Sequence, residues 1–169
     1  KNKLIKLLLI LLTNLILLEI SNAEEFSFEV SDILVSDKGN KYKGYNRGEI
    51  TTDNQIKITS DKFEYLKKIN RLEVSGDAQL TDIKNNMTIK ADKIFYLKND
   101  NKIYTLGKTV INISEKYQIE GSNLIFLKDE MILFSEKDTI IKDNFKNFYK
   151  LAEFEFLIDQ EILKGKKVE

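Results

Sequence analysis

The feature that most constrains the fold of this chain is a strand–turn–strand pattern that recurs about every thirty residues. The segments Ile58–Lys67, Ile89–Lys98 and Ile119–Lys128 align with one another without gaps. Similarity at a fixed period is typical of repeat architectures, in which one unit is too small to bury its apolar face alone and stacks on its neighbours. The chain is therefore expected to fold as a stack of repeated units.

The repeated units have the pattern of short β-strands. Apolar and polar residues alternate in segments such as Gln55–Thr59 and Thr109–Ile113, which favours strands with one buried face. The segment Phe148–Ile158 has the most helix-like pattern, but its alignment with earlier units favours a strand. Turn-forming residues separate the strands at Asp37–Asn40, Lys84–Asn86, Lys98–Asn101 and Lys128–Glu130. We predict an all-β fold of the sandwich, jelly-roll, barrel or solenoid type.

The spacing of apolar residues within each unit predicts a break in the strand. Ile58 and Phe63 are five residues apart, and the equivalent residues of the next two units have the same spacing. Residues an odd number apart on a regular strand point to opposite faces. A β-bulge or bend would bring both into one interior, and we predict one at Asp61–Lys62, Asp92–Lys93 and Ser122–Asn123. The alternative is that one residue of each pair faces outward and both faces are partly covered.

Stacking the units in register places apolar side chains in columns along the long axis of the domain. One column contains Phe63, Ile94 and Leu124, and the next contains Tyr65, Tyr96 and Phe126. Two interpretations remain open, because aromatic and aliphatic residues suit both. The columns form either a closed, dry core or a groove between two sheets that holds acyl chains.

The amino-acid composition excludes several kinds of functional site. The 169 residues include no cysteine and no histidine, so disulfides, thiolate metal sites and histidine general bases are excluded. The net charge is zero, which gives no overall electrostatic signature of nucleic-acid binding.

An enzyme is the alternative from another class of function. Carboxylates are plentiful, and acidic pairs such as Asp61 with Glu64, or Asp129 with Glu130, are candidates for a glycosidase-type site, although solvated surface charge is the ordinary explanation for them. The sequence has no Gly-rich phosphate loop, nucleophile elbow or metal-binding signature. We therefore predict no catalytic residue, no metal site and no cofactor.

The N-terminus has the pattern of a secretory signal peptide. Three lysines precede the apolar run Leu7–Leu18, and Ser21–Ala23 offers small residues for cleavage. The run is shorter than the roughly 20 residues of a membrane-spanning helix, although an uncleaved membrane anchor is the alternative. We predict a signal peptide over residues 1–23 and one folded domain over residues 24–169.

The C-terminal segment is interpreted as part of a further unit. Glu161–Glu169 reads like the second strand of a repeat whose remainder is missing. We therefore expect the domain to continue beyond residue 169. A short, lysine-rich natural C-terminus is the alternative.

A motif in two of the units resembles one found in a known protein family. Ala91–Tyr96, with the sequence Ala-Asp-Lys-Ile-Phe-Tyr, is followed by Gly107–Ile111, and Ser60–Tyr65 is likewise followed by Gly76–Leu80. These residues resemble the OstA-like domain of bacterial lipopolysaccharide-transport proteins. The family pattern is Ala-Asp, an aliphatic residue two positions on, a tyrosine two further, and a glycine that opens the next strand. The resemblance covers most of residues 26–169.

The sequence departs from the family pattern at several positions. Leu66 and Leu97 follow the two tyrosines, where the family often has aspartate. The third unit has Gly121–Ser122 in place of Ala-Asp and Lys137 in place of the glycine. These departures weaken the match of the third unit but keep its period.

The resemblance implies a V-shaped β-jelly roll, a stacked-strand solenoid whose apolar interior carries the acyl chains of lipid A. It also implies that such domains join end to end through their terminal strands. The expected partners are lipopolysaccharide, other OstA-like transport proteins, and the outer membrane if a β-barrel follows; nucleic acid is not expected. Carried onto this chain, the lipid-binding interior comprises Ile58, Phe63, Tyr65, Ile89, Ile94, Tyr96, Ile119, Leu124 and Phe126.

Two kinds of family member fit the sequence. The unfinished final unit favours the N-terminal periplasmic part of the outer-membrane assembly protein LptD. The alternative is a free periplasmic bridge protein of the LptA type. A structural β-solenoid that takes up no lipid is the alternative outside the family. The expected location is the periplasm or the outer membrane.

Overall fold

The computed structural model describes residues 26–52 and 55–167. The predicted signal peptide therefore lies outside the described residues. The strands are β1 Ser27–Ser36, β2 Lys41–Thr51, β3 Ile56–Ser60, β4 Lys62–Leu66, β5 Arg71–Asp82, β6 Met87–Leu97, β7 Lys102–Ile113, β8 Tyr117–Ser122, β9 Ile125–Leu127, β10 Ile132–Ser135, β11 Thr139–Asp143, β12 Phe148–Leu157 and β13 Ile162–Lys167. Short 3-10 turns are η1 Asp37–Gly39, η2 Lys67–Ile69, η3 Lys98–Asp100 and η4 Ile158–Gln160.

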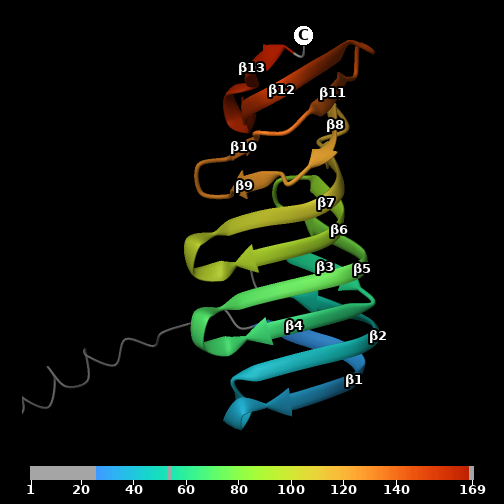
Figure 1. Ribbon diagram of the computed structural model, residues 1–169, viewed down its shortest axis with the longest axis vertical. Helices are drawn as coiled ribbons and strands as arrows, with labels where there is room; N and C mark the ends of the chain where they lie inside the picture. Colours follow the sequence, from blue (N-terminus) through green and yellow to red (C-terminus); the bar gives the residue numbers. More distant parts are fainter. Residues whose placement is uncertain (1–25, 53–54, 168–169) are drawn as a thin grey trace, which may run out of the picture.

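The strands lie one above another along the long axis of the molecule, with β1 at one end and β13 at the other (Figure 1). Neighbouring strands are antiparallel and belong to one continuous hydrogen-bonded sheet. The predicted all-β fold is confirmed, including a strand over most of Phe148–Ile158. No helix in the described ranges is long and apolar enough to cross a membrane.

The long strands bend near their middles, so the sheet folds into two walls that face each other. Wall A is built from β4, β9, β10, β13 and the parts of longer strands next to the 3-10 turns, which are 32–36, 41–44, 71–75, 93–97, 102–106 and 154–157. Wall B is built from β3, β8, β11 and the other parts, which are 27–30, 48–51, 78–82, 87–91, 109–113 and 148–151. The buried residues of both walls form one hydrophobic core between them.

The bend between the walls lies where the sequence predicts a break in the strands. The pairing of β6 with β7 shifts between Ala91 and Lys93, which leaves Asp92 out of the ladder. The Asp92 carboxylate instead accepts a hydrogen bond from the backbone N–H of Lys108 at 2.9 Å. Gly107 lies beside it with φ +77°, and a Cβ at this position would be only 2.1 Å from Asp92 Oδ2. This bulge explains why aspartate and glycine recur with the same spacing in two units of the chain.

The other two predicted breaks are also present. β3 ends at Ser60 and β4 begins at Lys62, and the backbone N–H of Asp61 donates to the Gly76 carbonyl at 2.8 Å. In the third unit β8 ends at Ser122, and Asn123 adopts a left-handed conformation with φ +55°. The prediction that each unit contains a β-bulge or bend between its two apolar residues is therefore confirmed.

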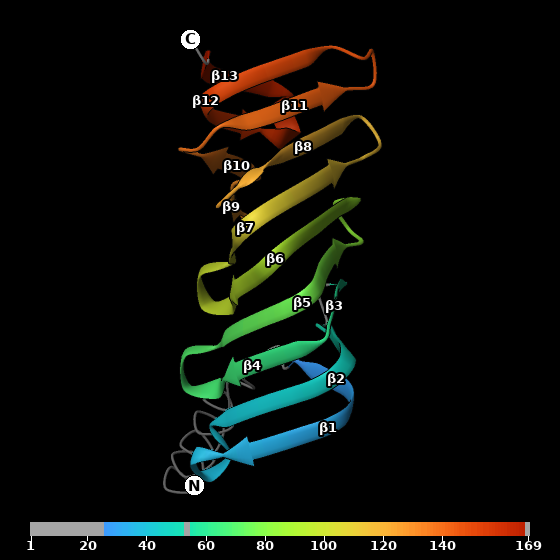
Figure 2. The ribbon, with the colours of Figure 1, turned by 45° about the vertical axis from the view of Figure 1, so that its right-hand side comes forward.

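At the far ends of both walls, the turns stack into two columns. On wall A, each turn donates a backbone hydrogen bond to the turn below it, as from Lys98 N to Asn70 O at 3.0 Å and from Lys128 N to Asn101 O at 3.0 Å. On wall B, Ser114 N donates to Asn86 O at 2.8 Å. Turns at opposite ends of the strands are visible in Figure 2. The gap between these two columns is the mouth of the V, opposite the bend.

Candidate functional site

Wall B contributes an unbroken column of apolar side chains to the interior. Each member is paired directly with the next across the strands, so the column follows the sheet register from β2 to β11. All of its members are almost completely buried. They are Ile50, Ile58, Leu80, Ile89, Ile111, Ile119 and Ile141.

Wall A contributes a second column that faces the first. Its members also pair directly across neighbouring strands, and aromatic rings alternate with aliphatic side chains along it. They are Tyr65, Leu72, Tyr96, Ile103, Phe126, Leu133 and Phe156, all buried. Phe63, Val74 and Ile94 form a shorter row beside it, nearer the bend. Across the interior, Tyr117 of wall B packs edge-on against Phe156 of wall A at 4.9 Å between ring centroids.

All nine residues predicted for the interior are buried between the walls. Three lie on wall B, at Ile58, Ile89 and Ile119, and the other six lie on wall A. The structure brings them together with residues that sequence reasoning missed, such as Leu80, Ile111, Leu72, Ile103 and Leu133. The missed residues lie on the return strand of each hairpin, and pairing the strands across each predicted turn would have identified them.

The end of the interior near β1 is filled by aromatic rings. Phe26 packs against Tyr65 and Tyr96, with ring centroids 5.0 and 5.8 Å apart. Phe28 stacks on Phe63 at 4.9 Å. The Lys98 ammonium lies 4.9 Å from the centroid of the Phe26 ring. Phe26, immediately before β1, therefore reaches from wall B across the mouth to wall A.

The interior contains a cavity near β13. A cavity of about 350 Å³ lies there between the walls, and apolar side chains of both walls line it, among them Tyr117, Ile141, Leu151, Phe156 and Leu163. For scale, an apolar protein cavity of about 150 Å³ accommodates benzene. The interior is therefore packed along most of its length but has room for an apolar group at this end.

The mouth holds a second, polar cavity of about 740 Å³. Gln55, Asp82, Lys84 and Asn85 line it from wall B, and Asn101, Lys128, Asp129, Met131 and Asp159 line it from wall A. Asp82 and Lys128 form an ion pair across it at 3.4 Å, with side chains only 1 % and 11 % exposed. The Lys128 ammonium also lies 5.8 Å from the centroid of the Tyr96 ring. A polar site and the apolar interior therefore meet at Tyr96.

The acidic pairs noted as candidates for catalysis have structural contacts. Glu64 is paired with Lys41 at 2.9 Å and with Lys43 at 3.2 Å, and the hydrogen bond from Lys41 is the main cause that lowers the pKa of Glu64. Asp129 accepts a hydrogen bond from the Asn101 side chain at 3.0 Å. Across the ranges that the structure describes, no group of acidic residues is arranged to hold a metal ion.

Comparison with solved structures finds the same fold in a lipopolysaccharide-transport component. The structure is similar to that of LptH, described as the LptA-homologous periplasmic component of the lipopolysaccharide transport device of Pseudomonas aeruginosa, with a TM-score of 0.59. The two sequences are 13% identical over an alignment that covers 65% of this chain and 80% of LptH. No family model and no curated protein sequence matches the chain. The jelly roll predicted from the sequence is therefore the fold observed.

Proposed function

We propose that this chain transports lipopolysaccharide, holding the acyl chains of lipid A between its two walls. The observation that carries the proposal is the continuous apolar interior, which runs from β2 to the cavity near β13. The similarity to LptH in fold and the recurring Ala-Asp…Tyr…Gly motif support it. Such a protein is a carrier without catalytic chemistry or a cofactor, and its expected location is the periplasm.

The interior suits an acyl chain for a simple physical reason. Each methylene moved from an apolar environment into water costs about 0.8 kcal/mol. An apolar path between two walls removes this cost, so a lipid can cross an aqueous compartment without a covalent step. Because side chains fill most of the space between the walls, uptake requires the walls to separate along the mouth, starting at the cavity near β13.

Two forms of the proposal differ in the role of the chain. In the form predicted from the sequence, the chain is the N-terminal periplasmic part of the outer-membrane assembly protein LptD, and a β-barrel follows it. The fold agrees equally with a free bridge protein of the LptA type. In both forms the chain would receive lipid from one similar domain and pass it to the next.

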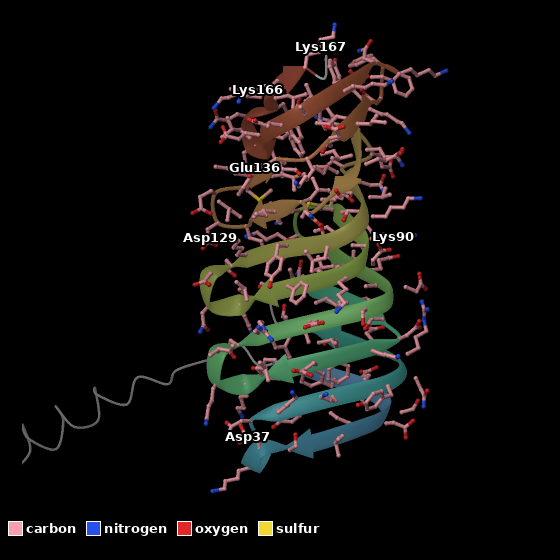
Figure 3. The ribbon with its side chains drawn as sticks, in the orientation of Figure 1. Asp37, Lys90, Asp129, Glu136, Lys166 and Lys167 are labelled. Atoms are coloured by element: carbon pink, nitrogen blue, oxygen red, sulfur yellow. The ribbon has the colours of Figure 1, made fainter. Side chains whose placement is uncertain are left out.

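Photo-crosslinking to lipopolysaccharide tests the proposal. A photoreactive phenylalanine analogue would replace Tyr96 or Phe126, which are buried in the wall A column. The matched control is Lys90, next to Ile89 on β6 but on the outer face of the strand. Lys90 lies on the opposite side of the molecule from the stacked turn that carries Asp129 (Figure 3). We expect lipid adducts at the two column positions and none at Lys90.

The other outcomes favour a different function. If the folded variants give no adduct at any position, or equal adducts at all three, the interior is a closed core. A structural β-solenoid that binds other proteins would then be the better reading. Circular dichroism of each variant establishes that the β-structure is retained.

A further inference from the structure

The two walls make contact across the mouth at three successive levels. Near β1, Phe26 reaches Lys98. In the middle, Asp82 meets Lys128, and near β13, Lys116 meets Glu161. At the two charged levels, the end of wall B contacts the second wall A turn that follows it along the chain. The mouth is thus spanned by contacts that follow the repeat.

The middle contact differs from the charged contact above it in its burial. Lys116 and Glu161 are both 51% exposed, so their attraction is screened by solvent and contributes little to holding the walls together. Asp82 and Lys128 are almost completely buried. Removing one partner of a buried ion pair leaves an uncompensated charge, whereas exchanging it for another group of the same sign does not.

The surroundings of Asp82 allow such an exchange. Its Oδ1 accepts the backbone N–H of Asn85 at 3.1 Å, and its Oδ2 accepts the Asn85 side-chain amide at 2.9 Å. Asp82 keeps these two hydrogen bonds if Lys128 leaves, and separation of the walls lets water solvate its carboxylate. Lys128, in turn, has a compact charge on a flexible stem, with three donors that suit a phosphate. Its ammonium lies directly above the apolar interior, over the Tyr96 ring.

We propose that the polar cavity at the mouth is the seat of an anionic, phosphate-bearing head group, and that Lys128 exchanges Asp82 for this group when acyl chains enter. This inference rests on the proposed function and specifies where the lipid's head group binds. The same exchange opens the mouth, because the ion pair between the walls is lost when Lys128 turns to the ligand.

The remaining charges of the cavity explain why the acyl chains are needed. Asp82, Asp129 and Asp159 outnumber Lys84 and Lys128 around it, so the cavity does not attract free anions from solution. A phosphate reaches Lys128 only when apolar burial of its own acyl chains brings it there. The site therefore selects an anionic amphiphile over inorganic phosphate.

The test is the affinity of the full chain for diphosphoryl lipid A and for the same lipid without its phosphates, measured by native mass spectrometry in detergent. We expect Lys128→Gln to weaken binding of diphosphoryl lipid A about tenfold, which corresponds to one lost charge-assisted hydrogen bond. Asp82→Asn is expected to strengthen it several-fold, because Lys128 no longer has a competing carboxylate. The two variants should bind the dephosphorylated lipid with the same affinity as each other, because both lack the ion pair.

Opposite changes in the affinity for diphosphoryl lipid A in the two variants would show that Lys128 contacts the ligand. If the ion pair had only a structural role, its loss would change this affinity in the same direction in both variants. The matched controls are Glu73→Gln and Lys93→Gln, which break an ion pair of 2.9 Å that lies within wall A. Both should bind like the unmodified protein. Thermal unfolding identifies a variant that fails to fold. If Lys128→Gln fails to fold, Lys128→Arg, which keeps the positive charge, should still bind diphosphoryl lipid A.

Three results would overturn the inference. One is equal binding of both lipids by the unmodified protein, which would leave the transport function standing. Another is a change of the same sign in Lys128→Gln and Asp82→Asn. The third is displacement of lipid A by inorganic phosphate alone, which would indicate a free-phosphate site. If neither lipid binds to any form of the chain, the proposed function itself fails.

Discussion

At the scale of single residues, the bend of the first two units depends on an aspartate and on a glycine of the next strand. Asp92 leaves the ladder and binds the backbone across the bulge, and Gly107 provides the positive φ and the space that its carboxylate needs. Asp61 and Gly76 repeat the arrangement, with a Cβ at Gly76 only 2.7 Å from Asp61 Oδ2. The aspartate and glycine of the recurring motif are therefore explained by the bend between the walls, whereas its apolar residues, such as Ile94 and Tyr96, lie in the interior.

Substituting Gly107 tests this explanation. A Cβ at Gly107 would be strained by its φ of +77° and would also collide with Asp92, whereas Gly39 has a similar φ of +85° with no atom within 4 Å. We expect Gly39→Ala to lower the free energy of unfolding by about 1 kcal/mol, from backbone strain alone. Gly107→Ala should lower it by about 2–4 kcal/mol, because strain and displacement of Asp92 add. Urea unfolding measures both, and equal losses would show that the contact with Asp92 is unimportant.

Residue patterns predicted one strand of each hairpin better than the other. Ile58, Ile89 and Ile119 were identifiable because they recur within an aligned motif. Leu80 and Ile111 pair with these residues and are equally buried, but their segments align less clearly. The Asp82–Lys128 contact was not predictable, because neither residue belongs to an apolar pattern and the pair forms only when the two walls face each other.

At the scale of elements, most turns repeat, and the turn between β11 and β12 is an exception. Its backbone is held by Asp143, whose carboxylate accepts hydrogen bonds from the backbone N–H groups of Phe145 and Asn147, both at 2.9 Å. The Asn147 side chain and the Tyr149 hydroxyl donate to the same carboxylate at 2.7 and 3.2 Å. No predicted turn covered this segment, since its order comes from one side chain rather than from the repeated turn residues.

The hydrogen bonds to Asp143 predict a pH-dependent turn. The Asn147 side chain is the main cause that lowers the pKa of Asp143 in the folded protein. A lowered folded-state pKa stabilises the fold above the unfolded value of about 4, and this stabilisation is lost as the pH falls through the folded value. Asp143→Asn should therefore destabilise the protein at pH 7, and its difference from the unmodified protein should shrink below about pH 4.

Chemical unfolding between pH 7 and pH 3 measures this effect. Asp138→Asn is the matched control, because this exposed carboxylate lies in the preceding loop and makes no hydrogen bond within the described part of the chain. It should leave the pH dependence unchanged. A difference between Asp143→Asn and the unmodified protein that stays constant over this pH range would contradict the assigned role of the carboxylate.

At the scale of the whole molecule, the described stack begins with β1 and finishes with β13. Within residues 26–52 and 55–167, β1 pairs with β2 alone and β13 pairs with β12 alone. Ile33, Leu34 and Val35 of β1 are each about half exposed, at 46%, 55% and 50%. A terminal strand with exposed apolar side chains is a template for pairing with another chain. The repeat predicted that such ends exist, but only the structure identifies which side chains are exposed on them.

End-to-end joining, which the proposed function requires, predicts that β1 governs self-association. Leu34→Lys places a charge at the centre of the exposed segment, where it would be buried by a second copy added to the edge, so we expect the association constant to fall about tenfold or more. Ile83→Lys is the matched control, because Ile83 is 58% exposed but lies in a turn of wall B away from both ends. Sedimentation equilibrium over a range of concentrations measures both variants. If the two variants associate alike, β1 is not the edge through which copies of the chain join.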